Sequence, residues 1–225
     1  AGASLAYAVD KLRRDAGHVR LLEYRNLEKN LEIDPISLRN LELVNTRFDS
    51  GKAGSLLGTI DFSSTSMGGR KLRNWVLRPL CDHDAIVARL DAVESFFLDP
   101  LTLAELRETL GIVRDLERIT GRINIGSATP RDFVALAVSL EALPGIKLLF
   151  GDTTVPLLLS LRDKLADFSE LVERLRATLE DEPPATLADG GVIRSGFDAV
   201  LDELRSATEN RGSRRSSSAR SNAPG

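Results

Sequence analysis

The sequence has few of the residue types from which metal and redox centres are built. Its 225 residues include one cysteine and two histidines, and aromatic residues make up only 5%. The single cysteine, Cys81, excludes a disulfide within the chain and fits a reducing cytosol, so we expect a cytoplasmic protein. His18 and His83 lie far apart in the sequence and offer no metal-ligand spacing. We therefore expect no metal site in this chain.

Motifs for nucleotide binding and nucleophilic catalysis are also missing. No Gly-x-x-x-x-Gly-Lys-Ser/Thr loop is present to cradle phosphates, and no Gly-x-Ser-x-Gly turn to present a nucleophile. No apolar run reaches the ~20 residues needed to cross a bilayer, and the start lacks a signal-peptide pattern. We expect no catalytic residue, no cofactor site and no membrane partner, and hence no enzyme activity in this chain.

Positive charge is scarce outside the last fifteen residues. The formal net charge is −3, but the tail carries Arg211, Arg214, Arg215 and Arg220 with no acid. The remaining 26 basic and 33 acidic residues give the body of the chain a net charge of −7. An acidic body is a poor stand-alone nucleic-acid binder. The arginines of the tail could form a nucleic-acid arm, but we favour the interpretation that they are incidental.

What the sequence does have is a helical pattern with clear start signals. Apolar residues recur three and four apart. A cap residue followed by proline marks helix starts at Asp34-Pro35, Asp99-Pro100 and Thr129-Pro130. Pro144-Gly145 punctuates the chain, and Pro183-Pro184 breaks it before an extended or looped segment. Helices are expected over residues 3–14, 34–43, 55–60, 67–77, 82–98, 100–110, 115–123, 130–143, 157–168, 170–180 and 195–210.

Two short apolar stretches near the N-terminus, residues 19–22 and 31–33, are the only expected strands. The tail, residues 211–225, has no large apolar residue, so it cannot contribute to a core and is expected to be disordered.

Several single residues carry both a structural and a functional interpretation, and the structural one is favoured for each. Trp75 follows Leu72 at i+3, which favours a core anchor over a stacking platform. Cys81 is interpreted as a half-buried structural thiol rather than a reactive one. His18 and His83 are interpreted as solvated or capping residues.

Charged and small residues near the middle of the chain are interpreted in the same way. Asp115 and Glu117 are two apart, so on a helix they would face different directions and form no acid–base pair. Asp115 and Arg118 are three apart and can pair with each other or with backbone. Gly68-Gly69 is expected to allow a tight turn before the helix of Trp75. The buried faces are expected to include Leu41, Leu72, Trp75, Ile86, Leu90, Val93 and Phe97.

Eight sequence blocks, in order over residues 2–210, resemble the MutS family. Each block alone is weak, but their order and spacing are specific. Ser66 stands where the family usually has proline before Met-Gly, which is a mild departure. The blocks are Gly2-Ala3-Ser4-Leu5-Ala6-Tyr7; Leu31-Glu32-Ile33-Asp34 with Arg39-Asn40-Leu41-Glu42-Leu43; Ser55-Leu56-Leu57 with Ile60-Asp61; Met67-Gly68-Gly69-Arg70-Lys71-Leu72 with Trp75, Arg78-Pro79-Leu80 and Asp82; Ile86 with Arg89-Leu90-Asp91-Ala92-Val93-Glu94; Asp115-Leu116-Glu117-Arg118; Ala128-Thr129-Pro130-Arg131-Asp132; and Asp189-Gly190-Gly191-Val192-Ile193 with Gly196-Phe197 and Leu201-Asp202-Glu203-Leu204-Arg205.

The resemblance implies a mainly α fold, the multi-helical MutS core (lever) domain with one or two short strands near the N-terminus. Residues 1–17 would be the end of the connector domain and a linker helix, and residues 18–210 the first half of the core. The family's mismatch reader, its DNA clamp and its dimeric ATPase, which uses ATP and Mg²⁺, have no counterpart here. The chain also begins at Ala1, which fits a fragment or a cleaved initiator methionine.

The function implied is therefore structural: a core domain that links the DNA-binding parts of a mismatch repair protein to its ATPase. Mismatched double-stranded DNA and a second copy of the protein would be partners of the parent, not of this chain, which is expected to be inactive alone. The alternative is a stand-alone helical scaffold that binds a protein and has no repair role.

Two further expectations follow from the resemblance. Residues 211–225 depart from the family pattern, and codons can be chosen so that a shifted frame restores that pattern. A frameshift near residue 210 is thus our hypothesis for this non-native tail. The missing half of the core should also leave an apolar stripe uncovered, which would make the chain prone to associate.

Overall fold

The computed structural model describes residues 4, 6–11, 30–48, 51–184 and 186–208, and it is mainly helical as predicted. The expected tail, residues 211–225, and the expected strand over 19–22 lie outside these residues. Residues 199–208 are also helical. The other elements are the π-helix Tyr7–Lys11, α2 (Pro35–Asn40), α3 (Leu56–Ile60), α4 (Ser66–Leu77), α5 (His83–Leu98), α6 (Pro100–Ile112), α7 (Leu116–Asn124), α8 (Pro130–Glu141), α9 (Leu143–Leu149), α10 (Pro156–Asp163), α11 (Ser169–Thr178) and the 3-10 helix Leu187–Asp189.

Most helices begin where the sequence places a capping side chain. Asp34 accepts hydrogen bonds from the backbone N–H groups of Ile36 and Ser37, at 2.9 and 3.0 Å. Asp82 caps α5 and Asp99 caps α6 in the same way. Each cap provides an acceptor for an N–H group that the first helical turn leaves unpaired. The predicted helix starts at these residues are confirmed.

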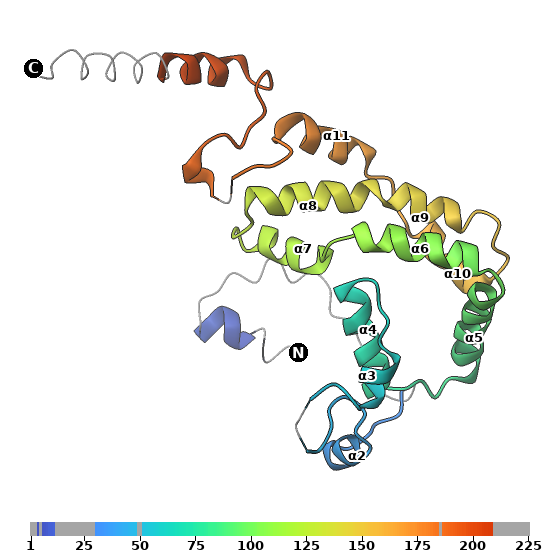
Figure 1. Cartoon of the computed structure of the whole chain (residues 1–225). Coiled ribbons are helices and arrows are strands. Elements are labelled where there is room, and N and C mark those ends of the chain that lie inside the picture. Colours follow the sequence, from blue (N-terminus) through green and yellow to red (C-terminus); the bar gives the residue numbers. More distant parts are fainter. Residues whose placement is uncertain (1–3, 5, 12–29, 49–50, 185, 209–225) are drawn as a thin grey trace, which may run out of the picture.

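The helices pack in pairs that lie far apart in the sequence (Figure 1). Helix α11 packs on α8, α6 packs on α9, and α10 packs on α5. In Figure 1, α7 and α8 lie together above α4. Helix α5 runs along one edge of the molecule and leads up into α6. None of the helices in the described ranges is long and apolar enough to cross a membrane.

One apolar core joins α5, α6, α9 and α10. The rings of Phe96 and Phe150 meet in a tilted arrangement, with centroids 6.2 Å apart, which is a favourable geometry for aromatic pairs. Met67 packs against this core from α4. The buried members are Ala92, Leu106, Val113, Ile146, Phe150 and Leu158.

The stripe of α5 that was predicted to be buried is instead exposed. Leu90, Val93 and Phe97 are 60%, 64% and 80% exposed, and Ile86 is also exposed. The buried face of α5 carries Ala92 and the half-buried Phe96. The prediction was wrong because α5 is apolar on two adjacent faces, and only one of them meets a neighbouring helix. The uncovered apolar stripe that was expected is therefore present, on α5.

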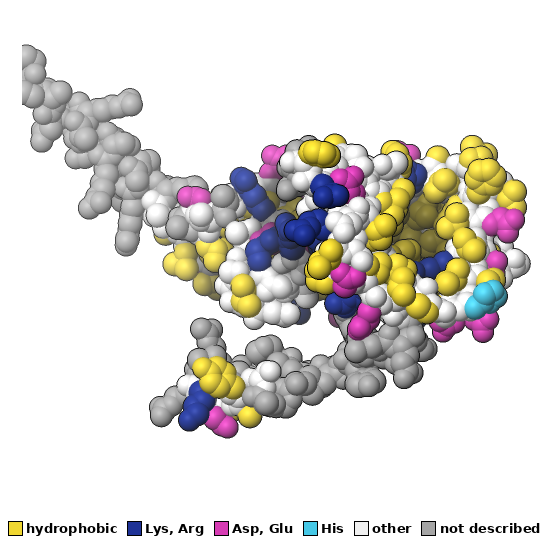
Figure 2. All heavy atoms as spheres, turned by 90° about the horizontal axis from the view of Figure 1, so that it is seen from below, with side chains coloured by type: hydrophobic (Ala, Val, Ile, Leu, Met, Phe, Trp, Pro, Cys, Tyr) yellow, Lys and Arg dark blue, Asp and Glu magenta, His cyan; other side chains and the backbone are white. Residues whose placement is uncertain are grey.

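A space-filling view shows where this exposed apolar surface lies. Seen from below, hydrophobic side chains ring a hollow on one side of the molecule (Figure 2). That side is the one on which α4 and α5 lie in Figure 1. Their exposed apolar residues are Trp75, Ile86, Val87, Leu90, Val93, Phe97 and Leu98.

The second predicted strand, residues 31–33, is not a strand. Residue 30 makes an isolated antiparallel β-bridge with residue 80, and the Leu31 N–H donates to the Pro79 carbonyl at 2.8 Å. Residues 31–34 have no regular secondary structure. A single bridge therefore forms where a strand was predicted, because the helix capped by Asp34 begins only a few residues after residue 30. A similar isolated bridge joins Leu179 and Ile193.

Gly68 and Gly69 form no turn before the helix, in contrast to the prediction, because both lie in the first turns of α4. Thr65 caps this helix by accepting from the Gly68 N–H at 2.9 Å. A Cβ atom at position 68 would lie 3.1 Å from the Thr65 hydroxyl oxygen. Glycine therefore relieves crowding at the cap.

Candidate functional site

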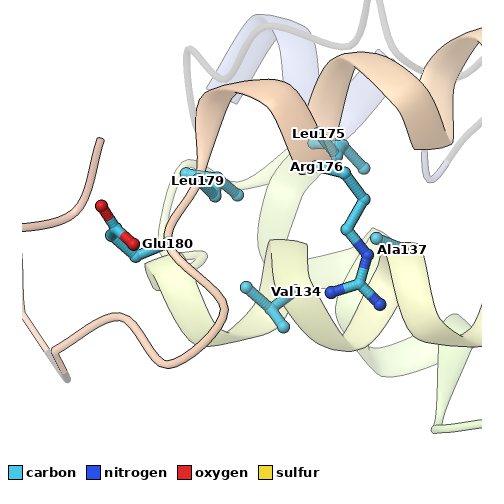
Figure 3. Close-up of a pocket in the computed structure, with 6 residues that line it drawn as sticks. All are labelled: Val134, Ala137, Leu175, Arg176, Leu179 and Glu180. Atoms are coloured by element: carbon cyan, nitrogen blue, oxygen red, sulfur yellow. The ribbon is translucent and has the colours of Figure 1, made fainter. Parts of the chain in front are cut away.

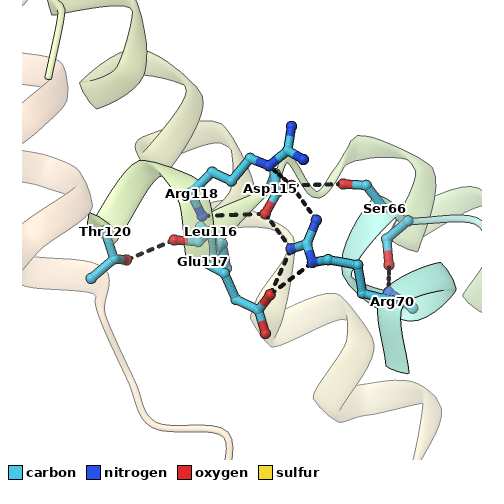
Figure 4. Close-up of polar contacts among 9 residues, drawn as sticks. Ser66, Arg70, Asp115, Leu116, Glu117, Arg118 and Thr120 are labelled. Atoms are coloured by element: carbon cyan, nitrogen blue, oxygen red, sulfur yellow. Dashed lines mark hydrogen bonds and ion pairs between the residues drawn. The ribbon is translucent and has the colours of Figure 1, made fainter. Parts of the chain in front are cut away.

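A polar junction between α4 and α7 is the most extensive charged cluster in the described residues. Arg70, on the second turn of α4, donates from two guanidinium nitrogens to the two carboxylate oxygens of Asp115, at 2.7 Å each (Figure 4). The same guanidinium donates to Glu117 at 3.1 and 2.6 Å. The Ser66 hydroxyl completes the cluster by donating to Asp115 at 3.0 Å. Forked pairing of this kind fixes the orientation of both partners.

Asp115 is placed at this junction by its second role as the N-cap of α7. It accepts from the Arg118 N–H at 3.3 Å, and its side chain lies 3.5 Å from the Arg118 guanidinium. The predicted pairing of Asp115 with Arg118 and with neighbouring backbone is confirmed. The hydrogen bond from Arg70 holds the pKa of Asp115 well below its usual range. Hydrogen bonds from Asp115 and Glu117 raise the pKa of Arg70 above its usual value. Arg70 and Asp115 are thus both charged near neutral pH.

A second ion pair joins α7 to α8. Arg122, near the end of α7, donates to the Asp132 carboxylate, with its Nε at 3.0 Å. Asp132 also accepts from the backbone N–H and the hydroxyl of Thr129, at 2.9 and 3.0 Å, and so stabilises the first turn of α8. The hydrogen bond from Arg122 lowers the pKa of Asp132. One carboxylate therefore both caps a helix and ties it to its neighbour.

A third ion pair joins α8 to α11. Arg176 donates to the two carboxylate oxygens of Glu141 at 2.6 and 2.7 Å. Its side chain crosses a shallow depression in which Val134 and Ala137 of α8 face Leu175 and Leu179 (Figure 3). Arg176 lines this depression, which encloses no space for a ligand. The depression therefore belongs to the contact between α8 and α11.

The residues singled out in the sequence as possible chemical groups are not gathered in a site. Cys81 is exposed, so its predicted half-buried position was wrong. His83 is exposed at the first position of α5, and His18 lies outside the described residues. Across the described ranges no three His, Cys, Asp or Glu residues come together in a group that could hold a metal ion.

Trp75 is not a core anchor, in contrast to the prediction. Its side chain is 40% exposed, and the Arg89 guanidinium lies over its ring, 3.8 Å from the centroid. This cation–π contact joins α4 to α5. The i+3 spacing from Leu72 predicted a core position for Trp75, but neighbouring residues cover its side chain only in part.

Arg70 is the residue of this junction that the sequence analysis did not single out. Asp115 and Glu117 were predicted to face different directions, yet both bind one guanidinium. This is possible because Asp115 is the cap, outside the regular helix, and because arginine has five donors in a fork. The available signal was that Arg70 and Asp115 each lie in a block resembling the MutS family.

Comparison with known proteins decides the family. A family model described as MutS domain III matches residues 36–221. The chain belongs to the MutS family. It is 42% identical over 206 residues to a DNA mismatch repair protein MutS of Brevibacillus brevis, and 43% identical over 204 residues to that of Myxococcus xanthus. A MutS of Methanosarcina mazei is 39% identical over 214 residues.

These matches cover nearly all of the chain but only part of the relatives. They span 92%, 91% and 93% of this chain, and 24%, 23% and 24% of the three MutS proteins. The chain therefore corresponds to about a quarter of the length of the MutS proteins that it matches. The resemblance to a MutS core domain, inferred from the sequence blocks, is confirmed.

Proposed function

We propose that this chain is a structural and coupling segment of a MutS-type DNA mismatch repair protein. In that role it would link the DNA-binding parts of a longer protein to its ATPase, and would itself neither bind mismatches nor hydrolyse ATP. The observation that carries the proposal is the series of junctions Arg70–Asp115, Arg122–Asp132 and Glu141–Arg176. Together they connect α4, α7, α8 and α11 in sequence.

Such junctions suit a segment that transmits movement. A forked arginine–carboxylate pair holds two helices in one relative orientation, and breaking it releases them together. Packed helices with discrete arrangements can pass a change from one end of a domain to the other. ATP and Mg²⁺ would bind to other parts of the longer protein, and mismatched DNA and the second subunit would contact those parts.

The first test uses the purified chain. Its binding to mismatched and fully paired duplex DNA is measured together with ATP hydrolysis in the same samples. The expected result is no preference for the mismatch and no turnover. Selective binding or turnover would show that chemistry assigned to other parts of the protein resides in this chain, and the proposal would be wrong.

The second test addresses coupling, in a full-length MutS protein in which this chain replaces the matching segment. Substitution of Arg70 by methionine should leave mismatch binding and basal ATP turnover unchanged, while ATP-triggered release from DNA slows by about fivefold or more. Arg70→Lys should give a smaller effect, because lysine keeps the charge but cannot form the fork. Arg107→Gln, at an exposed position of α6, is the matched control. Equal release rates in all variants would contradict a coupling role.

The alternative, a stand-alone scaffold that binds a protein, is favoured only by the exposed apolar face of α5. The chimeric protein distinguishes the two. A scaffold role predicts that Arg70→Met changes no step of the repair protein's nucleotide cycle.

A further inference from the structure

The helix over residues 199–208 is held to the rest of the chain by polar contacts more than by apolar packing. Its apolar side chains lie largely in solvent, since Val200 is 66% exposed and Leu204 is 60% exposed. Phe197, just before the helix, is 49% exposed. In Figure 1 this helix projects from the body of the molecule, beyond the loop that follows α11. Its direction therefore depends on the contacts of its polar side chains.

The segment just before this helix is anchored to α8 and α11. The Arg194 side chain donates to the Leu179 carbonyl at 3.1 Å and to the Asp181 carboxylate at 2.9 Å. Asp181 lies 3.5 Å from the guanidinium of Arg176, which pairs with Glu141 of α8. The position of the chain at Arg194 is therefore fixed relative to both helices.

A turn at Gly196 joins this anchored segment to the helix. Gly196 has a φ of +87°, a value that residues with a Cβ atom rarely adopt. A Cβ atom at this position would meet no atom within 4 Å, so the backbone conformation, and not crowding, favours glycine here. Residues 195–197 are all exposed. Contacts from outside the turn are therefore needed to fix the direction of the helix that follows it.

Two side chains of the helix reach back to the two ends of this turn. The Asp202 carboxylate accepts from the Gly196 N–H at 2.7 Å. The Arg205 guanidinium donates to the Ile193 carbonyl at 2.9 Å. Asp202 and Arg205 are also paired with each other at 3.5 Å, and both are half-buried. The pair thus holds the chain on both sides of the residue that makes the turn.

We propose that Asp202 and Arg205 form a latch that sets the direction of helix 199–208 relative to α8 and α11. With the latch closed, the helix is tied at two points to a segment that is itself anchored. With the latch open, the turn at Gly196 lets the helix change direction without unfolding. Because partly exposed polar contacts contribute little individually, the latch opens while the rest of the fold stays intact. Asp202 and Arg205 are positioning residues, and their role does not depend on the proposed coupling function.

The distance between two spin labels measures the direction of the helix in the full chain. The labels are attached in a Cys81→Ser background that carries Ala177→Cys in α11 and Ala207→Cys in the helix, both at exposed positions. The latched chain should give one narrow distance distribution. Arg205→Met should broaden it, with the ratio of open to latched molecules rising about fivefold, as for the loss of a hydrogen bond from a charged donor. Arg205→Lys should broaden it less, because lysine keeps a charged donor but not the fork.

Glu203→Met, at an exposed position of the same helix, is the matched control. It replaces a charged side chain by the same methionine and should leave the distribution narrow. Circular dichroism of each variant checks that helix content is unchanged. A broad distribution before any substitution in the latch would overturn the inference, and so would a distribution in Arg205→Met that stays narrow. Loss of helix content in Arg205→Met would also overturn it, since the pair would then stabilise the helix itself and not its direction.

Discussion

Ser139 shows how a single buried hydroxyl can hold two parts of the chain together. It has no exposed surface; its oxygen donates to the Ala135 carbonyl at 2.7 Å and accepts from the Arg114 N–H at 2.9 Å. The first bond lies within α8, and the second reaches the turn between α6 and α7. Ser55 serves the loop before α3 in a similar way, by bonding to the Val44 and Lys52 carbonyls and to the Gly58 N–H.

Substitution of Ser139 by alanine should lower the free energy of unfolding by about 1–3 kcal/mol, because the partly buried Arg114 N–H loses its acceptor. The measurement is urea unfolding followed by circular dichroism. Ser206→Ala is the matched control, since Ser206 makes the same bond within its helix, to the Asp202 carbonyl, but is exposed. An equal loss in both variants would mean that the contact with Arg114 contributes nothing.

At this scale the sequence predicted local partners and missed distant ones. The pairing of Asp115 with Arg118 follows from their spacing along one helix. The pairing of Asp115 with Arg70 spans 45 residues, and no periodicity connects them. Cys81 and Trp75 were assigned too much burial, because residue type gives only the average environment of a side chain.

At the scale of elements, the start of α8 is the clearest case of one residue serving two helices. Asp132 accepts from Thr129 at the start of α8 and from Arg122 of α7. Its substitution removes a helix cap and an inter-helix ion pair at once.

Asp132→Ala is expected to lower the free energy of unfolding by about 1–2 kcal/mol, of which the lost cap is the larger part. Urea unfolding provides the measurement. Asp84→Ala is the matched control: Asp84 is also acidic and also lies in the first turn of its helix, but its side chain is fully exposed and lies 3.5 Å from His83 alone. If Asp132→Ala proved as stable as Asp84→Ala, the dual role would be refuted.

Helix starts were predictable because their cause is local. The sequence shows directly where a side chain that can cap a helix precedes a helical pattern, as at Asp34, Asp99 and Thr129. Strands were not predictable in this way, because a strand forms only by pairing with another segment. Residue 30 pairs with residue 80 in a single isolated bridge. The sequence also did not predict which face of α5 is buried. Both faces carry apolar residues, and only the packing of neighbouring helices determines which one is covered.

At the scale of the whole molecule, the carboxylates of the junctions should make stability depend on acid. Arg70, Arg122 and Arg176 lower the pKa values of Asp115, Asp132 and Glu141 in the folded chain. Lys52 lowers that of Asp61 to about 2. Because these values lie below those of the unfolded chain, the stabilisation is complete above the unfolded pKa values and is lost as pH falls through the folded ones.

The free energy of unfolding should therefore be nearly constant from about pH 7 to pH 5 and should fall from about pH 4 towards pH 2. Urea unfolding at a series of pH values measures this. Asp115→Asn, which cannot ionise, should be less stable near neutral pH and should show a shallower decline. A stability that rises on acidification would contradict the role assigned to these pairs.

The uncovered stripe of α5 should make the isolated chain associate as its concentration rises. Sedimentation velocity over a range of concentrations measures this. Phe97→Glu, which places a charge at an 80% exposed position of the stripe, should reduce association without loss of helix content. Glu173→Phe, on the exposed surface of α11, is a control for added apolar surface elsewhere. A cooperative monomer at all concentrations would count against this prediction.

The sequence by itself determined the helical class, the helix starts and the family, because capping, periodicity and ordered motifs are properties of short stretches of chain. The domain boundaries, the absence of catalytic and cofactor residues and the frameshift origin of the tail stay predictions. Tertiary structure alone decided which apolar face of α5 is buried, that Arg70 binds both Asp115 and Glu117, and that the Arg89 guanidinium lies over the Trp75 ring. These depend on contacts between distant segments, and such contacts form only when the helices pack.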